Sequence, residues 1–329
     1  MRLDVCALLV CAFALVGVPN VATAQTQAKM YRVGILQTWP TGDFVERLAA
    51  FKSGLRALGY VEAQNILFEF RSAEGRTSEV PKLASELVEL NVDVIFAPTT
   101  AAAMAVHART RQIPIVIAVA ADPVAAKLIS TLARPGGNVT GMTTNSGEIV
   151  PKRLQLLQEL AGGRASRAGM LYAPADASNV LGLRQAQDAA RQLGIDLKPI
   201  SIGKEEELRG AFSAMRAEKL ELLLVSAGAV MDSHARQIAE LAAASKVPAL
   251  YGAPEFVEAG GLISYSASFV DNFRGAASYV DKILKGAKPA DMPVEQSSKF
   301  LLVVNRKAAK SLGLNIPSSL MVRVDRLIE

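Results

Sequence analysis

Residues 92–103 read VDVIFAPTTAAA, and this stretch decides the fold because it joins two kinds of secondary structure. Val, Ile and Phe favour a buried β-strand, whereas the alanines that follow favour a helix. Thr99 and Thr100 stand at the joint, and two roles are open to them. A threonine hydroxyl can cap the first turn of a helix. It can also join the free amides of that turn in holding a polar or anionic ligand.

The same change from strand to helix recurs along the first half of the chain. Apolar, β-branched runs such as YRVGILQ (31–37) and IPIVIAV (113–119) alternate with helical patterns, one of which we expect over residues 122–133. Continuous apolar strands between amphipathic helices are typical of a parallel sheet that is covered on both faces. The first half therefore predicts a doubly wound α/β sheet.

The second half repeats the pattern of the first. LELLLVS (220–226) ends in a hydroxyl residue, a helix is expected over 229–245, and VPALYG (247–252) follows as the next strand. A chain of 329 residues also exceeds what one hydrophobic core usually holds. We therefore expect an α/β protein with two doubly wound parallel-sheet lobes, joined by a hinge and separated by an interlobe cleft. Ligands of such sheets bind at the carboxyl ends of the strands.

The N-terminus has the pattern of a secretory signal peptide over residues 1–24. Arg2 precedes an apolar run, and the small-residue site that ends at Ala24 predicts cleavage there. A membrane anchor is the alternative, but the apolar run is shorter than the about 20 residues that span a bilayer. Both cysteines, Cys6 and Cys11, lie inside this segment, so the mature protein has no disulfide and no thiolate site. The sequence thus predicts an exported, periplasmic protein.

Several classes of function lack their sequence signals. There is no phosphate-binding loop, no dinucleotide-binding glycine pattern and no nucleophile elbow. The two histidines, His107 and His234, fall within expected helices, away from the strand ends. The net charge is +5, but no dense basic run or recognition motif accompanies it. We therefore expect no catalytic residues, no metal, no cofactor and no nucleic-acid partner.

Polar and aromatic residues gather where the expected strands end, and these residues form the candidate ligand site. Each has an ordinary alternative, since Asp122 can cap a helix and Tyr172 or Tyr251 can belong to the core. Together, aromatic faces and a few placed polar groups are what a small-molecule pocket needs. The candidate ligand-binding residues are Thr38, Trp39, Thr99, Thr100, Asp122, Thr143, Tyr172, Ser226, Tyr251 and Glu255.

Longer stretches resemble a known family. VDVIFAPTTAAAMAV (92–106), IPIVIAVAADPVAAKLISTLARPGGNVTG (113–141) and KRLQLLQEL (152–160) resemble the ABC transporter substrate-binding proteins of the tryptophan/tyrosine type, as does the stretch from AASYVDKILKG to the C-terminus. The resemblance implies a type I periplasmic-binding fold, in which a small molecule is trapped between two lobes and passed to an ABC permease in the inner membrane. It implies no catalysis.

The resemblance also implies how the chain is divided. The first lobe would comprise residues 31–145 and 268–290, and the second 146–267 and 291–329, with chain crossings near 145, 267 and 291 as the hinge. We expect a monomer. Two alternatives stay open: a periplasmic ligand-sensing subunit of a signalling system, and an exported enzyme. Aromatic and acidic residues in the candidate set favour an amino acid, including an aromatic one, or an aromatic acid as ligand.

Overall fold

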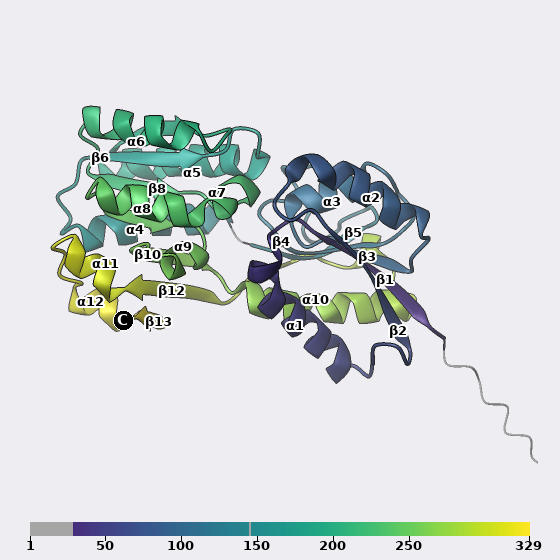
Figure 1. The fold of residues 1–329 in the computed structure, drawn as a ribbon. Helices are drawn as coiled ribbons and strands as arrows, with labels where there is room; N and C mark the ends of the chain where they lie inside the picture. Colours follow the sequence, from purple (N-terminus) through teal and green to yellow (C-terminus); the bar gives the residue numbers. More distant parts are fainter. Residues whose placement is uncertain (1–28, 145) are drawn as a thin grey trace, which may run out of the picture.

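The computed structural model describes residues 29–144 and 146–329, and it folds into two lobes that each contain one sheet (Figure 1). The expected signal peptide lies outside the described residues. None of the helices described in these two ranges is long and apolar enough to cross a bilayer. Two sheets with helices on both faces confirm the expected α/β fold class.

The elements of the first lobe occupy the chain up to residue 143 and return after residue 268. In chain order they are β1 (Tyr31–Gln37), α1 (Thr41–Ala57), β2 (Ile66–Ser72), α2 (Val80–Glu89), β3 (Val94–Phe96), α3 (Thr100–His107), β4 (Ile115–Ala120), β5 (Val139–Thr143), α10 (Phe269–Leu284) and β11 (Glu295–Gln296), with short 3₁₀ turns at Thr77–Glu79 and Pro289–Asp291.

The second lobe takes the middle of the chain and its end. Its elements are α4 (Ser146–Leu160), β6 (Arg167–Tyr172), α5 (Ala177–Leu193), β7 (Asp196–Ser201), α6 (Glu207–Ala217), β8 (Leu222–Val225), α7 (Ala229–Ser233), α8 (Ala235–Ala244), β9 (Ala249–Tyr251), α9 (Glu255–Glu258), β10 (Ile263–Ala267), β12 (Phe300–Asn305), α11 (Arg306–Ser311), α12 (Ser318–Met321) and β13 (Arg326–Ile328).

The two sheets share the order of their first five strands. The first has the strand order β2-β1-β3-β4-β5-β11, and all of its pairs are parallel. The second has the order β7-β6-β8-β9-β10-β12-β13, in which only the β10–β12 pair is antiparallel. Strand order therefore reverses between β1 and β3 and again between β6 and β8. These are the two switch points at which doubly wound sheets bind ligands.

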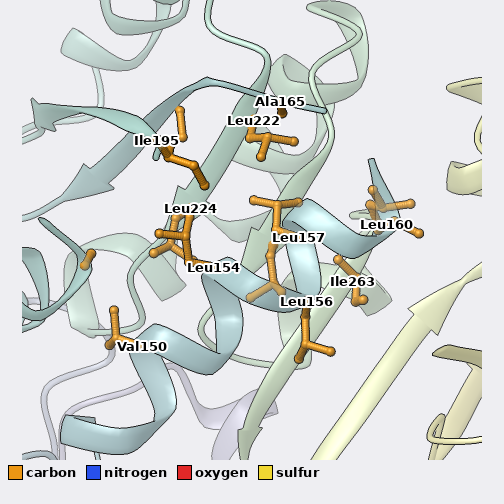
Figure 2. Packing of buried hydrophobic residues seen from close by; sticks show 14 of the residues in the cluster. Val150, Leu154, Leu156, Leu157, Leu160, Ala165, Ile195, Leu222, Leu224 and Ile263 are labelled. Atoms are coloured by element: carbon orange, nitrogen blue, oxygen red, sulfur yellow. The ribbon is translucent and has the colours of Figure 1, made fainter. Parts of the chain in front are cut away.

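Successive side chains of each strand point to opposite faces of the sheet, so each lobe has two hydrophobic cores, one on each face. In β8, Leu222 and Leu224 pack towards α4 and α5, whereas Leu223 and Val225 pack towards α6 and α8. Figure 2 shows Leu154 and Leu157 of α4 lying against Leu222 and Leu224. Because successive side chains of a strand point to opposite faces, a continuous apolar run is what a doubly covered strand requires.

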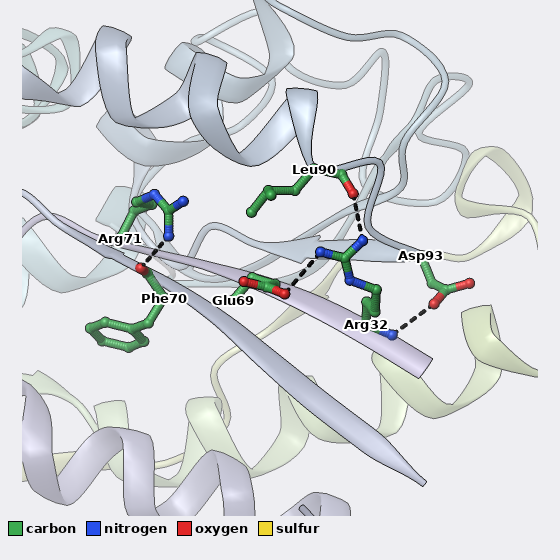
Figure 3. Close-up of polar contacts among 6 residues, drawn as sticks. All are labelled: Arg32, Glu69, Phe70, Arg71, Leu90 and Asp93. Carbon is green, nitrogen blue, oxygen red and sulfur yellow. Dashed lines mark hydrogen bonds and ion pairs between the residues drawn. The ribbon is translucent and has the colours of Figure 1, made fainter. Parts of the chain in front are cut away.

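The amino end of β1 is anchored by Arg32 (Figure 3). Its backbone N–H donates to Asp93 Oδ2 at 2.7 Å, and its guanidinium donates to Glu69 Oε1 at 2.9 Å and to the carbonyl of Leu90 at 2.8 Å. These bonds join β1 to β2 and to the loop before β3. They lie at the amino end of β1, opposite to Thr38. They therefore fix the position of the strand whose other end leads to Thr38.

The chain passes between the sheets three times: before α4, between β10 and α10, and between β11 and β12. Hydrogen bonds join the crossings, since the N–H of Ser297 donates to the carbonyl of Thr143 at 2.9 Å and the N–H of Ser268 to that of Lys299 at 2.9 Å. Because Glu295–Gln296 pairs with β5, the first sheet extends past the lobe boundary that we placed after residue 290.

Two expected helices differ in the structure. Residues 122–133 form turns, because Asp122 Oδ1 accepts the N–H groups of Val124 and Ala125 and Lys127 then takes a positive φ of 56°. The helix expected over 229–245 is divided into α7 and α8 at His234, whose φ of −114° and ψ of 19° interrupt helical geometry.

Candidate ligand-binding site between the lobes

A cavity of about 140 Å³ lies between the lobes, at the carboxyl ends of both sheets. Its first-lobe wall includes the residues that follow β1 and β3, and its second-lobe wall the residues that follow β6 and β8. Both switch points therefore open into one space. A cavity of this size suits one small molecule with a single ring system and its substituents.

The first-lobe wall is built from threonine hydroxyls. Thr99 Oγ1 accepts the N–H of Ala102 at 3.2 Å, so Thr99 is the N-cap of α3, and it lies 3.1 Å from Thr38 Oγ1. Thr100 Oγ1 accepts the N–H of Ala121 at 3.2 Å. The two roles that the sequence left open for Thr99 are compatible, because the residue caps a helix and also lines the cavity.

The second-lobe wall carries an acidic residue and an amide. Asp176 Oδ1 accepts the N–H and the hydroxyl of Ser178 at 2.9 and 2.7 Å. Asn179 accepts the N–H of Ala173 at 3.0 Å and donates to the carbonyl of Ala227 at 2.8 Å. Gly228 makes this packing possible: its φ is 142°, and a Cβ there would lie 2.9 Å from Asp176 Oδ2.

Ser226, at the end of β8, carries an unsatisfied hydroxyl in this wall. Its hydroxyl is buried and has no hydrogen-bond partner among the residues that the structure describes. A buried hydroxyl without a partner is costly, since it has lost its water and gained nothing in return. Because Ser226 lines the cavity, a bound molecule can supply that partner.

Arg153 of α4 brings a positive charge to the cavity. Its Nε donates to the carbonyl of Tyr265 at 2.7 Å and its Nη2 to the carbonyl of Gly252 at 3.0 Å. Burial lowers the pKa of the Arg153 guanidinium to about 10, which still leaves it charged at neutral pH. Burial also raises the pKa of the neighbouring Tyr265 hydroxyl.

Two contacts outside the threonine wall join the lobes directly. Trp39 Nε1 of the first lobe donates to Asp232 Oδ2 of the second at 3.2 Å. Arg47 of α1 forms an ion pair with Glu255 of α9. Since each contact needs its two lobes to approach, the structure holds the lobes closed over the cavity.

Half of the candidate residues from the sequence are brought together around this cavity. Thr38 and Trp39 follow β1, Thr99 and Thr100 follow β3, and Ser226 follows β8. Trp39 is only 5% exposed, because its ring stacks on Phe269 with centroids 6.1 Å apart and lies under the Arg47 guanidinium.

The other five candidates lie outside the residues that line the cavity, and most have different partners. Asp122 holds a turn, as described above, and the hydroxyl of Thr143 donates to the carbonyl of Ala120 beside the hinge. Tyr251 is buried in the core that faces α6 and α8, where its ring stacks on Phe256 at 5.0 Å and burial raises the pKa of its hydroxyl. Glu255 is the partner of Arg47, and Tyr172 ends β6 short of the cavity.

Several polar residues that line the cavity were not among those predicted from the sequence, including Asp176, Asn179, Asp232 and Arg153. Asp176 and Asn179 stand four and seven residues beyond the end of β6, so following that strand past Tyr172 would have found them. Asp232 was assigned to the body of a long helix that the structure divides. Arg153 lies inside a helix, where no local signal marks a residue as facing a cleft.

Comparison with known proteins agrees with this architecture. Residues 33–328 match the model of a family described as ABC transporter substrate binding protein. The chain is 24% identical over 286 residues to a tyrosine-binding protein of Clostridioides difficile, covering 87% of this chain and 82% of that protein.

Two solved structures are similar over 91% of this chain at 26% identity. An ABC domain from Streptococcus pneumonia in complex with L-Trp is covered completely, with a TM-score of 0.85. A ligand-free, open substrate binding protein with adhesive properties from Clostridium difficile is covered to 99%, with a TM-score of 0.70. At equal identity the ligand complex is the closer match in shape, which agrees with the closed lobes. With a family match over nearly the whole chain, a shared fold and a cavity between two lobes, this chain belongs to the ABC transporter substrate binding protein family.

Proposed function

We propose that this protein captures an aromatic amino acid between its two lobes and delivers it to the permease of an ABC importer. The observation that carries the proposal is a cavity that the carboxyl ends of both sheets share, lined by residues of both lobes. A ligand there contacts both lobes only when they are closed, so binding selects the closed state. A permease can then distinguish the loaded from the empty protein by shape.

The chemistry of the cavity suits an amino acid. Threonine hydroxyls, the Ser226 hydroxyl, Asp176 and Arg153 offer donors, acceptors and both signs of charge. Val119, Met170 and Leu224 add apolar wall, and Trp39 adds aromatic surface. We propose Thr38, Trp39, Thr99, Thr100 and Ser226 as ligand contacts. The relatives named for tyrosine and crystallised with L-Trp support an aromatic side chain.

The family and the N-terminal sequence support a proposal for the place of action. Substrate-binding proteins of ABC importers work outside the cytoplasm, and the sequence pattern of residues 1–24 is that of a signal peptide. We propose export to the periplasm, cleavage after Ala24 and function as a monomer. N-terminal sequencing of the protein from periplasmic extract and its mass by light scattering test these points.

A thermal-shift screen tests the ligand class. The protein is unfolded and refolded to remove any carried ligand, and its melting temperature is then measured with L-Tyr, L-Trp, L-Phe, L-Ala, L-Glu, D-glucose and inorganic phosphate. A ligand that binds only the folded state raises the melting temperature with its concentration. We expect the aromatic amino acids to give the largest shifts.

The variant Ser226→Ala tests the cavity itself, since it removes one lining hydroxyl with little change of volume. Its shift with the best ligand should be smaller than that of the wild type, whereas Ser213→Ala, at an exposed position of α6, should leave the shift unchanged. Shifts with glucose or phosphate alone would contradict the proposed ligand class.

A further inference from the structure

Arg153 places an unneutralised positive charge in the cavity. It lies on α4, three and four residues after Val150 and Ile149, so these residues share one face of the helix. All three line the cavity. The rest of α4 packs Leu154 and Leu157 into the core of the second lobe, which holds the helix, and Arg153 with it, in place (Figure 2).

Backbone carbonyls, rather than carboxylates, hold the guanidinium. Nε donates to the carbonyl of Tyr265, in the middle of β10, and Nη2 donates to the carbonyl of Gly252, which directly follows β9. Two bonds fix the plane of the group but use only two of its five N–H donors. Among the described residues, none accepts a hydrogen bond from Nη1 and no carboxylate forms an ion pair with Arg153.

Arg153 is half-buried, and a charge that is partly removed from water without a counter-ion is unfavourable, because the lost hydration is repaid only by an opposite charge or by a full set of hydrogen bonds. The lowered pKa of Arg153 has the same cause. The carbonyls of Tyr265 and Gly252 offset part of this cost. Because Arg153 lines a cavity that a ligand can enter, an anionic group of the ligand can complete the set.

We propose that Arg153 is the carboxylate-binding residue of this site, so that the ligand must carry a carboxylate; the inference rests on the proposed function. An Arg guanidinium suits this role because it keeps its charge when buried and pairs with a planar carboxylate by charge-assisted hydrogen bonds. Asp176 provides the complementary group for an ammonium. Its Oδ1 is used by Ser178, and no described residue donates to its Oδ2. The two residues together select a zwitterion.

The test compares pairs of compounds that differ only in the carboxylate. Calorimetric titration of the stripped wild type uses L-tyrosine against L-tyrosinamide and 4-hydroxyphenylacetate against its amide. A site that pairs a buried charge with the ligand should reject the amide by about 100-fold or more. In Arg153→Gln the affinity for L-tyrosine should fall by a similar factor, and the preference for acid over amide should disappear.

The ratio of the affinities for acid and amide distinguishes a loss of carboxylate recognition from a general loss of folded protein. A variant that merely folds poorly loses affinity for acid and amide alike, whereas loss of carboxylate recognition changes their ratio. Arg153→Lys keeps the charge and should keep a preference for the acid at lower affinity. Circular dichroism of each ligand-free variant checks that it is folded.

The outcomes distinguish the two proposals. If Arg153→Gln keeps the wild-type preference for acid over amide, or if the wild type binds only compounds without a carboxylate, the role of Arg153 is overturned. If the wild type binds 4-hydroxyphenylacetate through Arg153 but no amino acid, the inference holds and the amino-acid part of the proposed function fails. If no compound of the panel binds, both proposals fail.

Discussion

Arg47 of α1 and Glu255 of α9 form an ion pair that joins the two lobes, with side-chain exposures of only 7% and 16%. The guanidinium of Arg47 also lies over the rings of Trp39 and Phe269, at 4.5 and 5.1 Å from their centroids. Neither partner is among the residues that line the cavity. The first lobe thus holds a cation on an aromatic platform, and the second lobe supplies its carboxylate on closure.

The variant Glu255→Gln should favour the open state and weaken ligand affinity by at least about tenfold, because the apparent affinity scales with the fraction of closed protein. The melting temperature of the ligand-free protein should change little, since opening exposes both groups to water. Titration calorimetry and thermal unfolding measure the two effects. Glu258→Gln is the control: Glu258 is on the same helix but pairs with Arg326 of its own lobe. Equal loss of affinity in both variants would argue against the role of the interlobe pair.

Replacing Thr99 separates its two roles. Thr99→Val removes the acceptor for the N–H of Ala102, so the free energy of unfolding should fall by about 1 kcal/mol. Ligand affinity should fall as well, because the hydroxyl also lines the cavity. Thr99→Ser should restore both. A Thr99→Val protein that loses stability yet binds ligand as the wild type does would reduce the residue to a helix cap.

A substitution at Gly141 of β5 tests the close approach of β5 to β4. Its φ is 130°, and a Cβ would lie 2.1 Å from the carbonyl oxygen of Ile117 on β4. Gly141→Ala should therefore lower the free energy of unfolding by at least about 2 kcal/mol in urea titrations. Gly137→Ala, with open space around the position and no positive φ, is the matched control and should stay close to the wild type. Similar stability for the two variants would contradict the strained geometry.

His107 should give the stability a dependence on pH. Burial holds the pKa of His107 below its ordinary value of about 6.5. The unfolded chain therefore takes up the proton first as the pH falls, so stability declines below that value until the folded-state pKa is reached. The variant His107→Gln should show a shallower decline between neutral and mildly acid pH in urea titrations. An unchanged slope would mean that other groups cause the decline.

The strand patterns of the sequence predicted both the fold and part of the candidate site. Apolar runs such as residues 113–119 must be buried on both faces, so their alternation with helices specifies a doubly wound sheet and the edge at which ligands bind. Thr38 directly follows β1 and Thr99 stands three residues after β3, so their positions near strand ends made them candidates. Such residues are placed by local structure alone.

The remaining residues depend on tertiary structure that local patterns do not contain. Tyr251 and Leu250 are neighbours on β9, and only the packing of the sheet decides that Tyr251 faces the core at α6 and α8. Glu255 belongs to the contact between the lobes because α1 brings Arg47 to it from the other half of the fold. Arg153 reaches the cavity through the position of α4 as a whole, which its sequence alone does not reveal.

The fluorescence of Trp39, the single tryptophan of the chain, tests the central claim most directly, because its Nε1 donates across the lobes to Asp232. The stripped protein is titrated with L-tyrosine while tryptophan alone is excited, in the wild type and in Asp232→Ala. Capture between closing lobes predicts a saturable change of emission in the wild type, with the affinity that calorimetry gives, and a smaller change in Asp232→Ala. Binding seen by calorimetry that leaves the emission of Trp39 unchanged would contradict closure of the lobes over the ligand.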